Sequence, residues 1–444
     1  MKKNSIQQLS YTIITRLLIG YISLVGSSII SQSSPESVHI EVKAQQRGAL
    51  PILMVPMDQS HDTTKFNELC EYLKKDLSFT HQCAVTMQYL ANSPTKTDFE
   101  SFKKQGHELI LFIQFFDPNI IEWRLYDSTG PVMLKGKRLT LTGTTIRGWA
   151  HALADEVWPA LTGAPGFFST KLAYCKDIKD KHARSIKHIC IADYDGSHEQ
   201  VLVNTHTLNI APRWNIDTNC PLLFYSEHTN SNVRLMMSSM DKKRHVVVNF
   251  DGLTMLPAFS SDGKRVAFCA SRGDGACDLY CFDPNGLKRL TAHQGNNIAP
   301  FFAHNDNLLY FCSDRDGAPH IYAYDMTTKN TEAIVDSGYC VSPTYCETTK
   351  CLGYAKMVQG TMQLFTYDTI TKQHRQLTFD SGNKEECSWS PCGNYLLFSQ
   401  EKHLKSRIAL LNIHTGDKLF LTSAKDSCCY PTWSPRYAQL PIVS

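Results

Sequence analysis

The sequence predicts a mainly β protein, in which a six-bladed β-propeller follows a small α/β domain. Three observations support this prediction: a repeat of 43–45 residues, hairpin turns inside each repeat, and helical periodicity confined to the N-terminal third. The chain has 444 residues, 42% of them hydrophobic, which is enough to build a large core. This composition excludes a disordered or collagen-like chain.

The repeat is a proline followed two residues later by an aromatic residue, and it occurs six times in the C-terminal two thirds. Cys387 replaces the proline in the fifth copy. A period near 43 residues that contains four strands is typical of a propeller blade. The copies are APRW (211–214), LPAF (256–259), APFF (299–302), SPTY (342–345), ECSW (386–389) and YPTW (430–433).

Within a repeat, the turn residues separate four short strands. Residues 258–271 form two strands joined at Asp262-Gly263, and residues 278–283 form a third. Asn285-Gly286 then turns the chain into a fourth strand over residues 288–291. Asp-Gly and Asn-Gly between alternating apolar segments predict hairpins, because these residues tolerate a positive φ. A stacked helical solenoid could share the period, but helix-forming stretches are absent here.

The two ends of the array predict how the ring closes. The array begins at residues 167–175, which lack the proline-aromatic strand, and it ends just after the copy at residues 430–433. We therefore expect the last strand to become the innermost strand of the first blade. Six blades result.

The N-terminal third predicts a separate α/β domain. Gly163 ends its last helix. The predicted domain boundaries are 36–163 for the α/β domain and 164–444 for the propeller. The predicted elements are strands at 50–57, 107–116 and 120–127, and helices at 64–77 and 144–161.

Residues 1–34 are typical of a secretory signal peptide. Lys2, Lys3 and Arg16 precede or flank an apolar run over residues 17–30, and no acid occurs before Glu36. A buried helix or a membrane anchor is the alternative, but a 14-residue run is short for a bilayer span of about 20 residues. No later segment could cross a membrane, so we expect no membrane insertion of the mature chain.

The remainder of the chain has a formal net charge of zero. Without those three basic residues it carries 42 basic and 42 acidic residues. This balance disfavours a strongly basic nucleic-acid-binding protein. We expect a monomer that binds no nucleic acid.

Sixteen cysteines are many for a chain of this length. Their spacings match no zinc pattern and define no disulfide framework. Cys269 and Cys312 occupy equivalent places in the repeat, which favours small buried residues in strands. Some cysteines of an exported protein could be paired, and the spacing does not say which.

Motifs for catalysis are not found. The chain has no G-x-S-x-G elbow, no complete phosphate loop and no zinc-protease helix. We therefore predict no catalytic residue, no metal and no cofactor. An enzyme would require a cluster of His, Asp or Glu with shifted pKa values. The loops before the innermost strands contain acids but no histidine: Asp251, Asp336, Asp380, Glu385, Glu386 and Asp426.

These same loops are the predicted binding surface. They crowd around the mouth of the propeller channel and mix amides, small residues and a few apolar residues, as in a protein-binding face with an apolar centre and a polar rim. The alternative is a set of solvated loops whose Asn and Gly serve only the turns. The candidate partner-binding residues are Leu253, Thr254, Met255, Asn296, Asn297, Ile298, Tyr339 and Asn383.

Several segments resemble the periplasmic TolB proteins of the Tol–Pal cell-envelope system. The resemblance covers almost the entire mature chain and includes the domain order. The similar segments are DEVWPALTG (155–163), FFSTKLAY (167–174), ADYDG (192–196), APRW, LPAFSSDGKRVAF (256–268) and YPTWSP (430–435).

The resemblance implies a non-enzymatic periplasmic protein with two partners. The propeller would bind the peptidoglycan-associated lipoprotein Pal through the channel-mouth loops, and an N-terminal segment would contact TolA, with the two engagements coupled. In this chain that segment is residues 36–42, and Asn296 and Asn297 match the family pattern. Leu253–Leu256, Ile298-Ala299 and the mature start depart from it. The TolA-contacting residues would be Glu36, Val38, Ile40 and Val42.

The competing hypotheses are an exported propeller hydrolase or lyase that acts on peptides or glycans, and a ligand-binding propeller unrelated to Tol–Pal. Channel-facing carboxylates with shifted pKa values would favour the enzyme. Binding to a Pal-like lipoprotein would favour the Tol–Pal protein.

Overall fold

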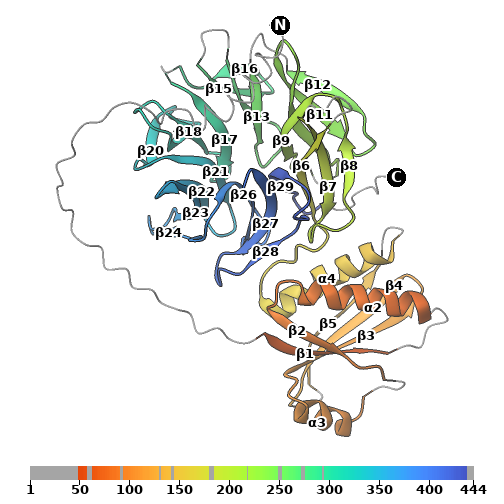
Figure 1. Cartoon of the computed structure of the whole chain (residues 1–444). Helices are drawn as coiled ribbons and strands as arrows, with labels where there is room; N and C mark the ends of the chain where they lie inside the picture. The colour runs from red at the N-terminus through yellow and green to blue at the C-terminus, as the bar shows by residue number, and fades with distance from the viewer. Residues whose placement is uncertain are drawn as a thin grey trace. The chain divides into compact units, whose positions relative to one another are not determined.

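The structure is a computed structural model (Figure 1). The described residues belong to one compact unit. The predicted signal peptide and the segment 36–42 lie outside these residues. The described ranges are 49–57, 63–90, 94–129, 132–141, 145–179, 185–217, 219–248, 253–271, 276–292 and 295–437.

The N-terminal part contains a five-stranded mixed sheet in the order β2-β1-β3-β4-β5. β1 is parallel to both of its neighbours, and β3, β4 and β5 pair antiparallel. The strands are β1 (Leu50–Pro56), β2 (Cys83–Met87), β3 (Leu109–Asp117), β4 (Ile120–Asp127) and β5 (Met133–Thr140).

Three helices cover this sheet: α2 (Thr63–Ser78), α3 (Lys96–Lys104) and α4 (Ile146–Thr162). Apolar residues of α2 and α4 pack in one cluster with β1, β3 and β4, whereas Phe99 and Phe102 of α3 pack on the opposite face. The predicted elements are confirmed to within two residues at each end; α3, β2 and β5 were not predicted. The domain boundaries at residues 36 and 163 stay a prediction.

Six four-stranded antiparallel blades form the propeller, which confirms the predicted fold class. Figure 1 shows them arranged around a common axis. Blades 1 and 2 are joined into a single sheet by one pair, Lys187 opposite Leu208. Within each blade the strands follow one another from the innermost strand outward.

Blade 1 is β29 (Cys428–Trp433), β6 (Lys171–Lys179), β7 (Ser185–Asp193) and β8 (Gln200–Val203). Blade 2 is β9 (Leu208–Trp214), β10 (Leu222–His228), β11 (Val233–Ser239) and β12 (Arg244–Val248). Blade 3 is β13 (Thr254–Phe259), β14 (Val266–Ala270), β15 (Asp278–Asp283) and β16 (Gly286–Arg289).

Blade 4 is β17 (Asn297–Ala303), β18 (Leu308–Ser313), β19 (His320–Asp325) and β20 (Thr331–Val335). Blade 5 is β21 (Cys340–Cys346), β22 (Cys351–Val358), β23 (Thr361–Asp368) and β24 (His374–Gln376). Blade 6 is β25 (Asn383–Trp389), β26 (Tyr395–Lys402), β27 (Lys405–Asn412) and β28 (Lys418–Phe420).

The proline-aromatic repeat marks a bulge in every innermost strand. The pairing register shifts across the proline, or across Cys387 in blade 6. Proline has no N–H to donate and is tolerated where the ladder is interrupted. The residue before it has a left-handed backbone, an uncommon conformation for residues other than glycine. These residues have φ between 53° and 60°: Ala211, Leu256, Ala299, Ser342, Glu386 and Tyr430.

The last strand closes the ring as the sequence predicts. β29 pairs antiparallel with β6, and Trp433 lies opposite Leu172. The Trp433 indole N–H donates to Thr170 Oγ1 at 2.7 Å. The Tyr437 hydroxyl donates to the Asn215 carbonyl at 2.9 Å, so the C-terminal segment also reaches blade 2.

Deleting residues 430–444 should therefore destabilise the whole propeller. The deletion removes the buried Trp433 and the pairing of β29 with Leu172 and Ala173 of β6. We expect thermal melting to shift downward by about 10 °C or more. A chain that ends at Tyr437 keeps these contacts and serves as the control. Equal melting of the two chains would contradict closure by β29.

Candidate partner-binding surfaces

The innermost strands all begin at one end of the propeller, and we call this end the entry face. It carries the loops that precede β9, β13, β17, β21, β25 and β29. Because the strands of each blade alternate in direction, the connections between the second and third strands lie at the same end. The opposite end, the exit face, carries the remaining turns.

All eight predicted partner-binding residues lie at the entry face, but their exposure differs. Thr254 and Asn297 are completely buried, whereas the other six are partly exposed. Each innermost strand has such a buried residue three positions before its proline (Cys387 in blade 6), with 0% of each exposed. They are Asn209, Thr254, Asn297, Cys340, Lys384 and Cys428.

Asn297 holds its loop instead of facing solvent. Its amide nitrogen donates to Asp278 Oδ1 at 3.2 Å and to the Cys277 carbonyl at 3.4 Å. Its Oδ1 accepts from the Ser313 hydroxyl at 3.0 Å and from the Arg315 guanidinium at 2.8 Å. Asn297 thus links blade 3 to blade 4 beneath the surface.

Asn296 has a similar anchoring role but is partly exposed. Its backbone N–H donates to Asp314 Oδ1 at 2.6 Å, and its side-chain amide donates to Asp314 Oδ2 at 2.9 Å. Gly295, with φ at 136°, approaches the same carboxylate so closely that a Cβ there would lie 2.9 Å from Asp314 Oδ1. Only glycine fits this approach without a shift.

A second anchor orders the loop before β25. The Lys384 ammonium, which is wholly buried, lies 3.3 Å from Asp380 Oδ1 and donates to Gln363 Oε1 at 3.2 Å. Asp380 also accepts from Lys418 at 2.6 Å and from Gln400 at 3.1 Å. Burial opposes ionisation of Asp380, but these partners hold its pKa at about 2.

Two exposed apolar residues at the entry face were not predicted from the sequence. Phe379, just before the loop at 380–383, is 77% exposed, and Leu404, between β26 and β27, is 91% exposed. Neither belongs to the repeated motif, so periodicity could not single them out. Large apolar side chains that stay exposed beside a polar rim are typical of protein contact sites.

Two carboxylates of β25 have shifted pKa values. Burial, with the charges of Glu386 and Glu401, raises the pKa of Glu385 to about 8. Burial also raises the pKa of Glu386. Glu386 Oε2 accepts from the Tyr430 backbone N–H at 2.6 Å and from the Ser399 hydroxyl at 2.9 Å. Glu386 therefore connects β25 to the closing strand β29.

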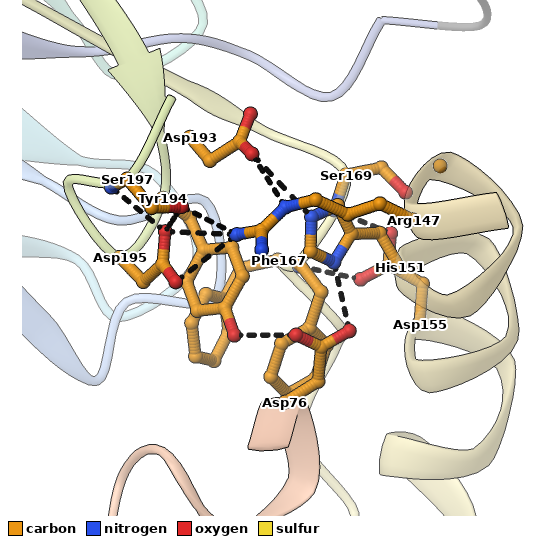
Figure 2. A network of polar contacts seen from close by, with 12 residues as sticks. Asp76, Arg147, His151, Asp155, Phe167, Ser169, Asp193, Tyr194, Asp195 and Ser197 are labelled. Carbon is orange, nitrogen blue, oxygen red and sulfur yellow. Dashed lines mark hydrogen bonds and ion pairs between the residues drawn. The ribbon is translucent and has the colours of Figure 1, made fainter. Parts of the chain in front are cut away.

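The α/β part contacts the propeller through a buried polar network (Figure 2). His151 of α4 has its Nδ1 2.7 Å from Asp76 Oδ2 on α2 and its Nε2 3.8 Å from Asp193 Oδ2 at the end of β7. The Tyr194 hydroxyl donates to the other Asp76 oxygen at 2.8 Å. One imidazole thus bridges two carboxylates that belong to different parts of the chain.

Arg147, one turn before His151 on α4, extends the network to the turn after β7. Its Nε donates to Asp193 Oδ2 at 2.7 Å, and a terminal nitrogen lies 3.1 Å from Asp195 Oδ2. Lys171 also pairs with Asp193. Because Asp193 ends β7 and Asp195 lies in the connection between β7 and β8, α4 contacts the exit face of blade 1 (Figure 2).

These contacts keep the imidazole charged. Burial alone would lower the pKa of His151, but Asp193 and Asp76 outweigh it and raise the pKa to about 9. Burial disfavours the charged form of Asp193 too, yet His151 and Lys171 hold its pKa well below the usual range. His151 is therefore an imidazolium in a buried ion-pair network at neutral pH.

Asp155 and Gly166 fix the connection between α4 and the propeller. Asp155, buried and 3.3 Å from the Arg436 guanidinium, accepts from the backbone N–H groups of Phe168 at 2.7 Å and Ser169 at 3.1 Å. A Cβ at Gly166 would lie 2.5 Å from Asp155, so glycine is required there. Around this turn, aromatic residues of both parts share one apolar cluster: Trp158, Phe167, Phe168, Tyr194, Tyr395 and Trp433.

The described part of the chain lacks both a metal-binding cluster and a membrane-spanning helix. It contains no group of three or more His, Cys, Asp or Glu side chains arranged to hold a metal ion. It also contains no helix that is long and apolar enough to span a membrane.

Comparison with known families now assigns the fold. Residues 158–437 match the family model described as the TolB beta propeller domain. The chain belongs to the TolB family. The match includes both the ring-closing strand and the entry face.

Relatives and a solved structure agree with this assignment. Tol-Pal system protein TolB from Francisella tularensis subsp. mediasiatica (strain FSC147) is 32% identical over 197 residues, and the protein of that name from F. tularensis subsp. tularensis (strain FSC 198) gives the same identity and length. These alignments cover 43% of this chain and 44% of each relative, so they span less than half of either protein.

The crystal structure of TolB from Acinetobacter baumannii superposes with a TM-score of 0.75 at 22% identity. The superposition covers 87% of this chain and 97% of the A. baumannii chain. At this identity the likeness concerns the fold alone, and it extends beyond the propeller into the α/β part.

Replacing His151 with glutamine should destabilise this TolB-family protein in a pH-dependent way. A raised pKa means that the charged imidazole stabilises the fold fully below about pH 6.5, and that this contribution disappears as pH rises through about 9. We expect His151→Gln to lower the free energy of unfolding by roughly 3 kcal/mol near pH 6. The loss should be much smaller above about pH 9.5. Urea unfolding at both pH values measures it.

His198→Gln is the matched control, because His198 contacts the same Asp193 carboxylate at 3.1 Å but is mostly exposed. We expect it to change the unfolding free energy little at either pH. A His151→Gln loss that does not vary with pH would show that the imidazole acts by packing rather than by charge.

Proposed function

We propose that this chain is a non-enzymatic periplasmic component of the Tol–Pal system that binds Pal at its entry face and TolA through residues 36–42. In this role it supports outer-membrane integrity and constriction of the envelope at cell division. The observation that carries the proposal is the family match over the propeller, together with relatives named Tol-Pal system protein TolB.

The entry face supports a protein partner. Leu253, Met255 and Ile298 are partly exposed there, and Phe379 and Leu404 are largely exposed. Buried anchors such as Asn297 and Lys384 order the loops before any partner arrives, which reduces the entropy lost on binding. A preordered apolar surface with a polar rim is suited to a folded lipoprotein domain.

The contact between α4 and the exit face supports coupling between the two partner sites. The segment 36–42 precedes β1 of the α/β part, which contacts the propeller through His151 and Arg147. A partner bound at the entry face would then shift the conformational equilibrium of the N-terminal segment, because the ring connects the two sites. Coupling between two such sites is typically ~1–3 kcal/mol.

Calorimetric titration with the soluble domain of Pal from the same cell tests the binding face. We expect saturable one-to-one binding that weakens by at least about tenfold in Phe379→Glu and in Leu253→Glu, since each variant places a charge in the apolar centre. Ile370→Glu is the matched control. Ile370 is 74% exposed, like Phe379 at 77%, but it lies in the β23–β24 turn on the exit face.

Unchanged affinity in Ile370→Glu would locate the interaction at the entry face. No binding of the unmodified protein at about 100 μM would overturn the Pal proposal. Equal weakening in all three variants would instead indicate a loss of folding, which far-UV circular dichroism detects.

Deleting residues 36–42 tests the coupling. If the N-terminal segment and the Pal site share a two-state equilibrium, the deletion should change Pal affinity by about 5- to 100-fold. Titrating the deleted and full mature chains with the same Pal domain measures this change. Identical Pal affinities would disprove coupling while leaving the Pal site itself intact.

A further inference from the structure

Two cysteines meet at the seam of the ring. Cys429 of β29 lies directly opposite Cys175 of β6 in the antiparallel pair that closes the propeller. Cys175 is completely buried and Cys429 is 9% exposed. This pair joins the first strand of the propeller to its last strand.

The equivalent pairs in the other blades show that packing explains Cys175 but not Cys429. On the second strand this position always holds a small residue, whereas the innermost strand holds a larger one. At this position, blade 1 alone places a thiol on both strands. The other pairs are Ile210 with Ser226, Met255 with Cys269, Ile298 with Cys312, Val341 with Ala355, and Glu385 with Ser399.

We propose that Cys175 and Cys429 form a disulfide bond that closes the propeller covalently. Residues directly opposite each other in an antiparallel pair have Cα atoms about 4.5–5.5 Å apart, within the range of about 4.4–6.8 Å that a disulfide spans. Their side chains also lie on the same face of the sheet. The oxidising conditions that this bond requires rest on the periplasmic location in the proposed function.

The bond forms by thiol–disulfide exchange with an external disulfide, for which oxidised glutathione is the probe. The thiolate of one cysteine attacks the probe, forms a mixed disulfide and releases one glutathione thiol. The second cysteine attacks the mixed disulfide and releases the other. Two cysteine thiols are thereby oxidised, one glutathione disulfide is reduced, and the two protons end on the released thiols.

The burial of the pair determines when this exchange occurs. Burial raises the pKa of Cys429 to about 12 and that of Cys175 well above its ordinary value, so the folded thiols are poor nucleophiles. The Lys187 ammonium, 3.2 Å from Cys429 Sγ, favours the thiolate locally. Exchange therefore takes place while β29 is docking, and the finished ring protects the bond.

A second opposed pair provides the matched control. Cys346 and Cys351 face each other across β21 and β22, but only four residues separate them. The stabilisation from a cross-link grows with the length of the loop that it closes. A bond between residues 175 and 429 spans nearly the whole propeller, so its effect on unfolding should be far larger.

The test refolds the full mature chain from denaturant in a mixture of oxidised and reduced glutathione. Free thiols are then alkylated, and the protein is digested without reductant for mass spectrometry. We expect one cross-linked peptide pair that contains Cys175 and Cys429. Alkylation of both residues, or a bond from Cys429 to another cysteine, would overturn the proposal.

Urea unfolding with and without reductant measures the consequence. The midpoint should fall on reduction in the unmodified chain and in Cys346→Ser, but not in Cys175→Ser. Serine at residue 175 should fold, because Ser226 and Ser399 occupy the same place in blades 2 and 6. A midpoint that falls equally in Cys175→Ser would contradict the proposal. Neither readout involves Pal, so this test is independent of the proposed binding function.

Discussion

The propeller depends on one non-local pairing, that of β29 with β6. Every other blade is built from four consecutive strands and needs only local turns. In the first blade, the innermost strand comes from the C-terminal end of the chain. That strand also carries Trp433, which packs in the apolar cluster shared with α4. The closure and the attachment of the α/β part therefore use the same residues.

The attachment itself combines apolar packing with a buried set of charges. The carboxyl groups of Asp76, Asp193 and Asp195 face three basic side chains, those of Arg147, Lys171 and His151. A buried ion network costs desolvation, and its geometry must be correct for the costs to be offset. Moving α4 away from blade 1 would remove Arg147 from Asp193 and Asp195, so the network favours this placement of α4.

Periodicity made most of the fold predictable. The proline-aromatic repeat predicts the innermost strands, because each copy marks the same bulge, and the missing first copy predicts closure by the last strand. α3 was not predicted, since Phe99 and Phe102 are its only buried positions in nine residues. β5 was not predicted because it is an exposed edge strand without apolar alternation.

The partner surfaces were less predictable, for a physical reason. Periodicity locates loops but does not say which of their side chains point inward. Asn297 and Thr254 look like surface residues in the sequence and are completely buried, whereas Phe379 and Leu404 look like core residues and are exposed. The network around His151 joins residues 76, 151 and 193, whose proximity depends on how α4 meets blade 1. No local pattern encodes that contact.

The buried residue near the start of each innermost strand has an evolutionary consequence. Asn297 and Lys384 set the shape of the entry-face loops from below, while neighbours such as Ile298 and Phe379 meet solvent. Loop shape and surface chemistry are therefore controlled by different residues. Substitutions in the outer layer can adapt this face to a changing partner while the ring and its loops keep their geometry. A lineage could thus retain the same architecture while its recognition surface drifts.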